Sequence, residues 1–249
     1  MHTPGRNPIT LGIGAVRRLG GALLDLVYPP TCGGCGRAGT RFCPRCTAQV
    51  AWLDAGPFCL RCGRPTFAET ACPWCQTAPP LLDAIRSAAL FTGPLRQATH
   101  AFKYTGRADL AEPLAGLMVA FWERHPLPAD LTVPVPLHPN RQRERGFNQA
   151  GLLAQAFAAR TGLPLALEGL ARIRETAPQV GLNAQERRDN VRGAFRAQGD
   201  AWAGRRPLLI DDVCTTGATL EACARALRSA GSQAVYALTL ARADLGPAE

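Results

Sequence analysis

Eight of the ten cysteines in this 249-residue chain fall between positions 32 and 75, and their spacing is typical of a metal-binding segment. They form four C-x-x-C units. A two-residue spacer lets two thiolates reach one ion from a single turn, so two such units complete a tetrahedral zinc site. The pattern predicts two closed, structural zinc sites, with the ligands Cys32, Cys35, Cys43, Cys46, Cys59, Cys62, Cys72 and Cys75.

The pairing of these units has two solutions. Consecutive pairing joins the first unit to the second and the third to the fourth, whereas cross-bracing joins the first to the third. Consecutive pairing is favoured because shorter loops cost less entropy to close. A disulfide framework would indicate a secreted chain. The first thirty residues lack a secretory pattern, because Arg17 and Arg18 interrupt their apolar stretch, and no apolar run reaches the ~18–20 residues of a membrane span. We therefore expect a cytoplasmic zinc protein.

A second group of residues could bind a phosphorylated sugar. An apolar run at 208–210 leads into Asp211 and Asp212 and then into a loop of small and hydroxyl-bearing residues. The N–H groups at a helix start form an anion site, and paired carboxylates accept hydrogen bonds from a vicinal diol or hold a hydrated divalent ion. A ligand with a phosphate beside a ribose diol satisfies both. The loop residues are Val213, Cys214, Thr215, Thr216, Gly217, Ala218 and Thr219.

The elements that must position these residues follow an α/β pattern from position 81 onward. Apolar runs predict buried strands at 131–135, 207–210 and 234–240, and helical periodicity appears at 152–160 and 220–230. Strand–loop–helix–strand units at this spacing predict a parallel sheet flanked by helices. We accordingly divide the chain into an amphipathic helix (1–30), a double zinc-ribbon domain (31–80) and an α/β domain (81–249).

The charge is strongly basic, with a formal net charge of +9, and Lys103 is the only lysine among 28 basic residues. A guanidinium holds phosphate oxygens in pairs, so the arginine excess fits phosphate recognition, although a biased base composition would also produce it. Arginines close to the cysteines either compensate the thiolate charge or contact nucleic acid. Aromatic residues in so small a zinc domain are expected as hydrophobic filler more than as base-stacking platforms; they are Trp52, Phe58, Phe67 and Trp74.

These motifs resemble two known patterns. The stretch 208–220 resembles the phosphoribosyl pyrophosphate motif of type I phosphoribosyltransferases. From about Cys32 to Leu240, the chain resembles the ComF competence-protein family, which joins a cysteine-knuckle domain to a phosphoribosyltransferase-like domain. The run 145–149 matches its R-G-F-N-Q element and Lys103-Tyr104 its K-Y element. Positions between Thr176 and Phe195 match T-x-x-Q-x-x-L, R-x-x-N-V and A-F.

The resemblance implies a type I phosphoribosyltransferase-like fold with a site for phosphoribosyl pyrophosphate and Mg²⁺. Asp211 and Asp212 would hold the ribose as catalytic residues, and the loop at 213–219 would bind the 5′-phosphate. Arg141, Arg145 and Lys103 would meet the remaining phosphates. A mobile loop that closes over the substrate would contain Arg174, Thr176, Gln179, Arg187 and Asn190, unless this segment is a plain surface excursion.

Two functions stay open at this point. One is a phosphoribosyltransferase whose acceptor would be selected by a hood built from residues 81–105 and the zinc domain. The other is an adaptor that handles single-stranded DNA together with DNA-uptake or recombination proteins. The intact acidic pair and phosphate loop favour the enzyme, and the family's link to competence favours the adaptor. Steep salt dependence of strand binding would indicate the adaptor.

Overall fold

The structure is a computed structural model that describes residues 29–176, 183–199 and 201–243. The helix predicted at the amino terminus, and Gln179 of the predicted mobile loop, lie outside these residues. Within the described part of the chain, no helix is long and apolar enough to cross a membrane.

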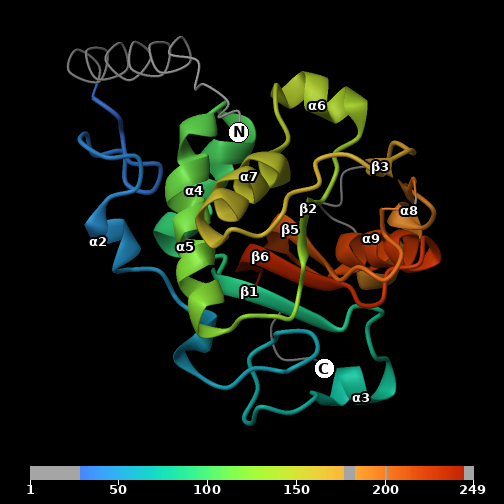
Figure 1. The fold of residues 1–249 in the computed structure, drawn as a ribbon. Helices are drawn as coiled ribbons and strands as arrows, with labels where there is room; N and C mark the ends of the chain where they lie inside the picture. Colours follow the sequence, from blue (N-terminus) through green and yellow to red (C-terminus); the bar gives the residue numbers. More distant parts are fainter. Residues whose placement is uncertain (1–28, 177–182, 200, 244–249) are drawn as a thin grey trace, which may run out of the picture.

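Four parallel strands form the central sheet in the order β1-β6-β5-β2 (Figure 1). Their bounds are β1 Ala84–Leu90, β2 Leu131–Pro134, β5 Pro207–Cys214 and β6 Tyr236–Arg242. Nearly every residue of the four strands is buried, because both faces of the sheet are covered. The predicted parallel sheet flanked by helices is confirmed.

Helices cover the two faces of the sheet unequally (Figure 1). One face carries α4 (Gly93–Tyr104), α5 (Ala111–Arg124) and α7 (Gln149–Thr161), and the other carries α9 (Ala218–Ser229). Successive strand residues point to opposite faces. Leu208 and Ile210 therefore belong to the core on the first face, while Leu209 belongs to the core beneath α9.

Shorter elements frame the carboxyl ends of the strands. They are η2 (Ala108–Leu110), α6 (Pro139–Arg145), β3 (Leu170–Arg172), α8 (Ala184–Val191) and β4 (Phe195–Ala197). β3 and β4 form an antiparallel pair that packs on α9, and α8 lies beside it.

The cysteine-bearing segment lies against the edge strand β1. It contains α2 (Pro44–Thr47), η1 (Leu53–Ala55) and α3 (Pro73–Thr77). The backbone N–H of Leu90 donates to the carbonyl of Ala51 at 2.8 Å, and that of Ile85 donates to Arg61 at 2.7 Å. Both ribbons thus cover the otherwise open edge of β1. Cys32, Cys43 and Cys46 of the first ribbon also share the hydrophobic core formed by α4 and α5.

Three local expectations differ from the structure. β5 runs through the acidic pair to Cys214 instead of stopping at Ile210, because these residues continue the ladder with β6. The basic loop after β2 is the helix α6, whose start is favoured by Pro139 and by the cap of His138 on the N–H of Asn140. The segment 81–105, expected as part of a hood, forms the edge strand β1 and the covering helix α4.

Candidate functional site

The acidic pair lies at the carboxyl end of β5, next to the start of α9. The Asp211 carboxylate accepts a hydrogen bond from the N–H of Asp212 at 2.9 Å. Burial, and then the neighbouring charge of Asp212, raise the pKa of Asp211 to about 7. The pair therefore changes charge near neutral pH, which makes its occupancy by a hydroxyl-rich or cationic ligand sensitive to pH.

Lys103 at the end of α4 reaches across to this pair. Its ammonium lies 2.8 Å from the Oδ1 of Asp212, and both side chains are largely buried. Burial alone would lower the pKa of Lys103, but the charge and hydrogen bond of Asp212 outweigh it and hold the pKa above its usual value. Without a ligand, the single lysine therefore neutralises an acid and does not face open solvent.

A second cation, Arg172 at the end of β3, lies near enough to interact with the charge of Asp211. Burial lowers the pKa of Arg172, and the nearby charge of Asp211 partly opposes this shift. Its guanidinium lies 5.3 Å from the ring centroid of Phe195 and donates to the hydroxyl of Thr176. Among the described residues, the buried Nε of Arg172 has no hydrogen-bond partner. Arg141 of α6 donates to the backbone oxygen of Thr176 at 3.2 Å, so α6 and the segment after β3 are joined.

The loop between β5 and α9 has the form expected of a phosphate-binding turn. Gly217 immediately precedes α9 with φ +84°, a left-handed conformation that glycine adopts without strain. The hydroxyl of Thr216 accepts from the N–H of Ala218 at 3.4 Å. Thr215 and Thr219 are partly exposed, whereas Cys214 is buried. The thiol of Cys214 has a raised pKa, chiefly because of burial, so it is a packing residue.

The run 145–149 connects the end of α6 to the start of α7. The side chain of Asn148 donates to the carbonyl of Val135 at 3.1 Å. Arg145 donates to the Gln149 side chain at 3.1 Å, and its guanidinium lies 5.4 Å from the ring centroid of Tyr104. Arg145 thus lies beside the residue that follows Lys103, while Asn148 holds the backbone at the site's rim.

The predicted mobile loop is only partly described. Arg174 donates to the backbone oxygens of Asn190 and Arg192, at 3.0 and 2.7 Å. Asn183 and Glu186 form a capping box at the start of α8. These bonds tie the two ends of the segment together. Arg187 lies on α8 with a buried Nε that has no partner among the described residues.

The cysteines form two separate clusters in consecutive pairing, as predicted. Cys32, Cys35, Cys43 and Cys46 form one cluster and Cys59, Cys62, Cys72 and Cys75 the other; within each, the sulfurs lie within 4.8 Å of one another. This arrangement fits a tetrahedral ion with four thiolate ligands. Burial opposes ionisation of Cys32 and Cys59, but backbone N–H groups directed at their sulfurs prevail and bring the pKa of each to about 6.

Two buried arginines join the second zinc cluster to the sheet. Arg86 of β1 donates to the carbonyl of Leu60 at 2.9 Å, and its guanidinium lies 5.0 Å from the ring centroid of Phe58. Arg242 of β6 donates to the carbonyl of Cys62 and is 4% exposed. A cluster of four thiolates with one Zn²⁺ carries two negative charges, so these cations compensate it.

Sequence reasoning missed Arg86, Arg172 and Arg242 as site residues. The available signal was a charged residue inside an apolar strand, as in AIRSAAL and YALTLAR. The expectation that the zinc-domain aromatics are filler is correct for Phe58 and wrong for Phe67 and Trp74, which are exposed.

Comparison with known proteins identifies the two parts of the chain. Residues 23–76 match the double zinc ribbon domain, and residues 146–247 match the phosphoribosyl transferase domain. DNA utilization protein YhgH of Salmonella typhi is 34% identical over 228 residues, which cover 88% of this chain and 93% of that protein. Competence protein F of Haemophilus influenzae is 32% identical and covers 81% of this chain and 90% of its own length. Glutamine phosphoribosylpyrophosphate amidotransferase from B. subtilis superposes on 57% of this chain and 30% of that one, with a TM-score of 0.39 and 22% identity.

Proposed function

Because the chain belongs to the ComF family of competence proteins, we propose that its phosphoribosyltransferase-like domain binds phosphoribosyl pyrophosphate with Mg²⁺ at the end of β5. One observation carries this proposal: Asp211 and Asp212 stand directly before a glycine-containing turn into a helix start, and two cations, Lys103 and Arg172, interact with them. In this arrangement the carboxylates accept from the ribose hydroxyls, and the turn holds the 5′-phosphate.

The cations around the acidic pair suit the pyrophosphate group of such a ligand. The buried Nε of Arg172 has no hydrogen-bond partner among the described residues, so it is available to a ligand. Arg172 and Arg141 both donate hydrogen bonds to Thr176, which brings the two guanidinium groups together. Guanidinium groups stabilise negative charge that develops on a departing pyrophosphate. We therefore place Arg172 beside Arg141 and Arg145 in the proposed phosphate-binding set.

Magnesium fits the oxygen donors present at this site, since it prefers carboxylate and phosphate oxygens. Lys103 already contacts Asp212, so the ion would be held mainly by Asp211 and the oxygens of the ligand. When bound there, the ion would neutralise negative charge on the phosphates. The protein's own contribution is to orient the ribose through the acidic pair and to keep Lys103 and the arginines facing the anionic end.

The reaction class that follows is substitution at the anomeric carbon, with pyrophosphate as the leaving group. A nitrogen acceptor would approach the anomeric carbon from the face opposite the departing pyrophosphate, and so from the side away from the arginines of β3 and α6. On this proposal the protein is a phosphoribosyltransferase, and an assay of its activity requires a nitrogen acceptor to be identified.

Calorimetric titration of phosphoribosyl pyrophosphate with Mg²⁺ tests the proposal. The variant Asp211→Asn with Asp212→Asn loses charged hydrogen-bond acceptors for the diol, each worth about 1.5–3 kcal/mol, so affinity should fall at least about a hundredfold. The matched control, Glu123→Gln with Glu168→Gln, removes two exposed acids elsewhere and should bind like the wild type. Absence of binding to folded, zinc-loaded wild type would refute the proposal.

A second candidate is the handling of single-stranded DNA, in which the same site holds a DNA end. The observation that favours it is the naming of the relatives as a DNA utilization protein and a competence protein, together with the net charge of +9. Binding through several phosphates must weaken steeply as salt rises. Strand affinity that stays flat between low and moderate salt would eliminate this candidate.

A further inference from the structure

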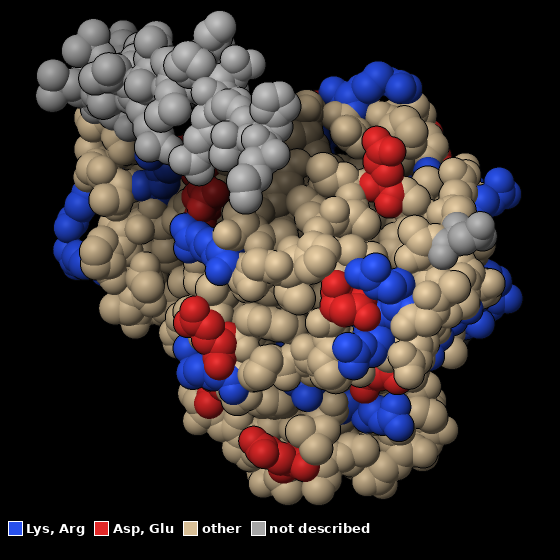
Figure 2. All heavy atoms as spheres, viewed as in Figure 1, with Lys and Arg blue, Asp and Glu red and all other residues tan. Residues whose placement is uncertain are grey.

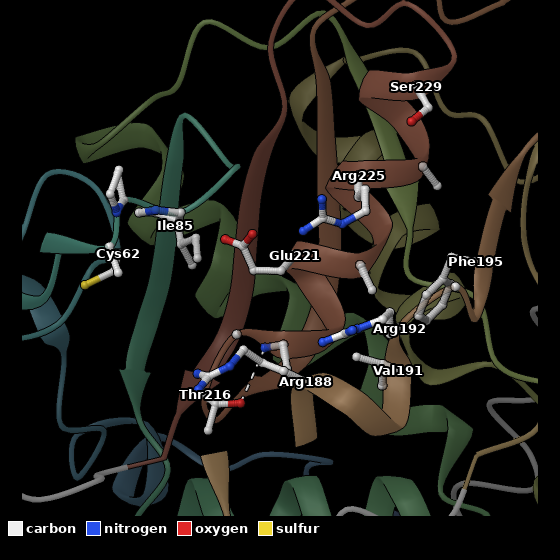
Figure 3. A pocket seen from close by; sticks show the side chains of 18 of the residues that line it. Cys62, Ile85, Arg188, Val191, Arg192, Phe195, Thr216, Glu221, Arg225 and Ser229 are labelled. Carbon is white, nitrogen blue, oxygen red and sulfur yellow. Dashed lines mark hydrogen bonds between the residues drawn. The ribbon is translucent and has the colours of Figure 1, made fainter. Parts of the chain in front are cut away.

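A long groove runs along the outer face of α9, apart from the acidic pair. It has a volume of about 800 Å³ and extends from Thr216 at one end of the helix to Ser229 at the other (Figure 3). Twelve helical residues at about 1.5 Å per residue give it a length of about 18 Å. The second zinc ribbon and the linker at 78–80 form one wall, and α8 with β4 forms the other.

The groove is strongly cationic. Six arginines line it: Arg64, Arg188, Arg192, Arg196, Arg225 and Arg242. Figure 3 shows Arg188, Arg192 and Arg225 beside the helix, within the groove. Figure 2 shows basic side chains gathered on the side of the molecule where Figure 1 places α8 and α9. Such a density of guanidinium groups attracts a ligand with several negative charges.

Among the described residues that line the groove, Glu221 is the single acid, and it is already engaged. Both carboxylate oxygens of Glu221 lie 3.1 Å from the backbone N–H of Leu81 and accept from it. Burial raises the pKa of Glu221, which weakens its competition for the arginines further. Arg192 pairs with Asp189 at 2.7 Å, and Arg242 is held by the Cys62 carbonyl. Among the described residues, Arg64 and Arg196 of the groove make no side-chain hydrogen bond or ion pair. The groove therefore keeps positive charge available for a ligand.

One wall carries an aromatic surface. Trp74 of the second ribbon lines the groove and is 49% exposed, although a tryptophan in a small zinc domain is expected to be buried. Alternating phosphates and flat bases match a surface that combines arginines with an exposed indole. An acidic peptide would use the arginines but would leave the indole without a stacking partner.

The groove and the proposed phosphate loop share residues. Thr216, Gly217 and Ala218 line the groove and also form the turn at the start of α9. A ligand lying in the groove therefore ends at the loop. A terminal phosphate carries about two charges and three free oxygens, whereas an internal phosphodiester carries one charge, so the loop favours a strand end over the middle of a strand.

We propose that this groove binds a single-stranded oligonucleotide whose terminal phosphate occupies the loop at 215–219 while the following nucleotides lie along α9, against the arginines and Trp74. The inference rests on the proposed phosphate loop and on the second candidate function. It adds the surface that holds the strand and the chemical group that is recognised. It also makes the strand end and phosphoribosyl pyrophosphate competitors for one loop.

Fluorescence anisotropy with short oligothymidylates tests the proposal on the zinc-loaded full chain. An oligonucleotide with a terminal phosphate should bind about tenfold more tightly than the same strand without one. Separate probes phosphorylated at the 5′ or the 3′ end identify which end enters. Equal affinity of all three probes would overturn the assignment of the loop.

The groove itself is tested with Arg192→Gln, Arg196→Gln and Arg225→Gln combined. Removing three phosphate contacts from a single strand should reduce the slope of log affinity against log salt by about 2. The matched control, Arg37→Gln, Arg45→Gln and Arg96→Gln, removes the same charge from exposed positions outside the groove. If both triple variants lose affinity equally, net charge alone drives binding and the groove is not the site.

Phosphoribosyl pyrophosphate separates failure of this inference from failure of the proposed function. The groove variant should keep the wild-type affinity for this small ligand, and the ligand should displace the phosphorylated strand. A strand that binds wild-type protein but is not displaced by saturating ligand overturns the shared loop. A wild type that binds the phosphorylated strand but not phosphoribosyl pyrophosphate would refute the proposed function and leave the groove standing.

Discussion

Substitution of Lys103 by methionine removes the cation that faces Asp212 and keeps the length of the apolar stem. At a separation of 2.8 Å and an effective dielectric constant of about 20, the gross attraction is about 6 kcal/mol, much of which offsets desolvation. Removing one partner of a buried pair typically costs about 3–5 kcal/mol. We expect Lys103→Met to lower the free energy of unfolding by about 3 kcal/mol at pH 8.

The loss should depend on pH with a definite sign. Without Lys103, Asp211 has one cation fewer nearby, so its folded-state pKa, already about 7, rises further above the unfolded value of about 4. An acid with a raised folded-state pKa destabilises the fold increasingly as pH rises from its unfolded to its folded pKa. The cost of Lys103→Met should therefore shrink to about 1 kcal/mol at pH 5.

Urea denaturation of the zinc-loaded protein at pH 5 and pH 8 provides the measurement. The same substitution in an Asp212→Asn background is the control, because the charge that Lys103 neutralises is then absent and the cost should fall below about 1 kcal/mol. A cost that is equal at both pH values and in both backgrounds would refute the electrostatic argument. It would show that Lys103 contributes only the packing of its stem.

Three further predictions concern the ribbons. Gly63 has φ +70°, and a Cβ added there would lie 2.5 Å from the carbonyl oxygen of Ile85, so Gly63→Ala should lower the free energy of unfolding by more than about 2 kcal/mol. The control Gly36→Ala has nearly the same φ, +72°, but open space around the added Cβ, so it should cost about 1 kcal/mol. Thermal unfolding of the two variants measures the difference. Arg242→Met leaves the Cys62 carbonyl without its donor, so it should cost about 1–3 kcal/mol and speed the release of one of two zinc ions to a chelator, while Arg45→Met changes neither. Cys43→Ser should halve the zinc content and, because Cys43 lies in the core shared with α4 and α5, should also lower the melting temperature of the α/β part; unchanged zinc content would contradict the ligand assignment.

Local sequence patterns were enough to predict much of the architecture. The knuckle spacing predicts both zinc clusters and their pairing, because the ligands of each lie within a short loop. The acidic pair, the small-residue turn and the helix after it are contiguous in the chain, so their neighbourhood follows from the order of the residues. Alternating burial of Leu208, Leu209 and Ile210 follows from a strand covered on both faces.

The partners of the site's charged residues could not be predicted in the same way. Lys103 forms an ion pair with Asp212. Arg242 donates a hydrogen bond to the carbonyl of Cys62, which lies 180 positions earlier in the chain. Such contacts depend on strand order and on which helix covers which face. The extension of β5 through Asp211 was also missed, because its ladder with β6 overrides the low strand preference of acidic residues.

The cover that the ribbons place over β1 has a consequence for the order in which the chain folds during synthesis. β1 pairs with β6, which is the last strand in the described part of the chain, so β1 is synthesised well before its sheet neighbour. Each ribbon closes over a short loop that emerges before β1, so metal binding is completed early. The ribbons therefore cover one edge of the nascent β1 and prevent that edge from pairing with other chains before β6 is synthesised.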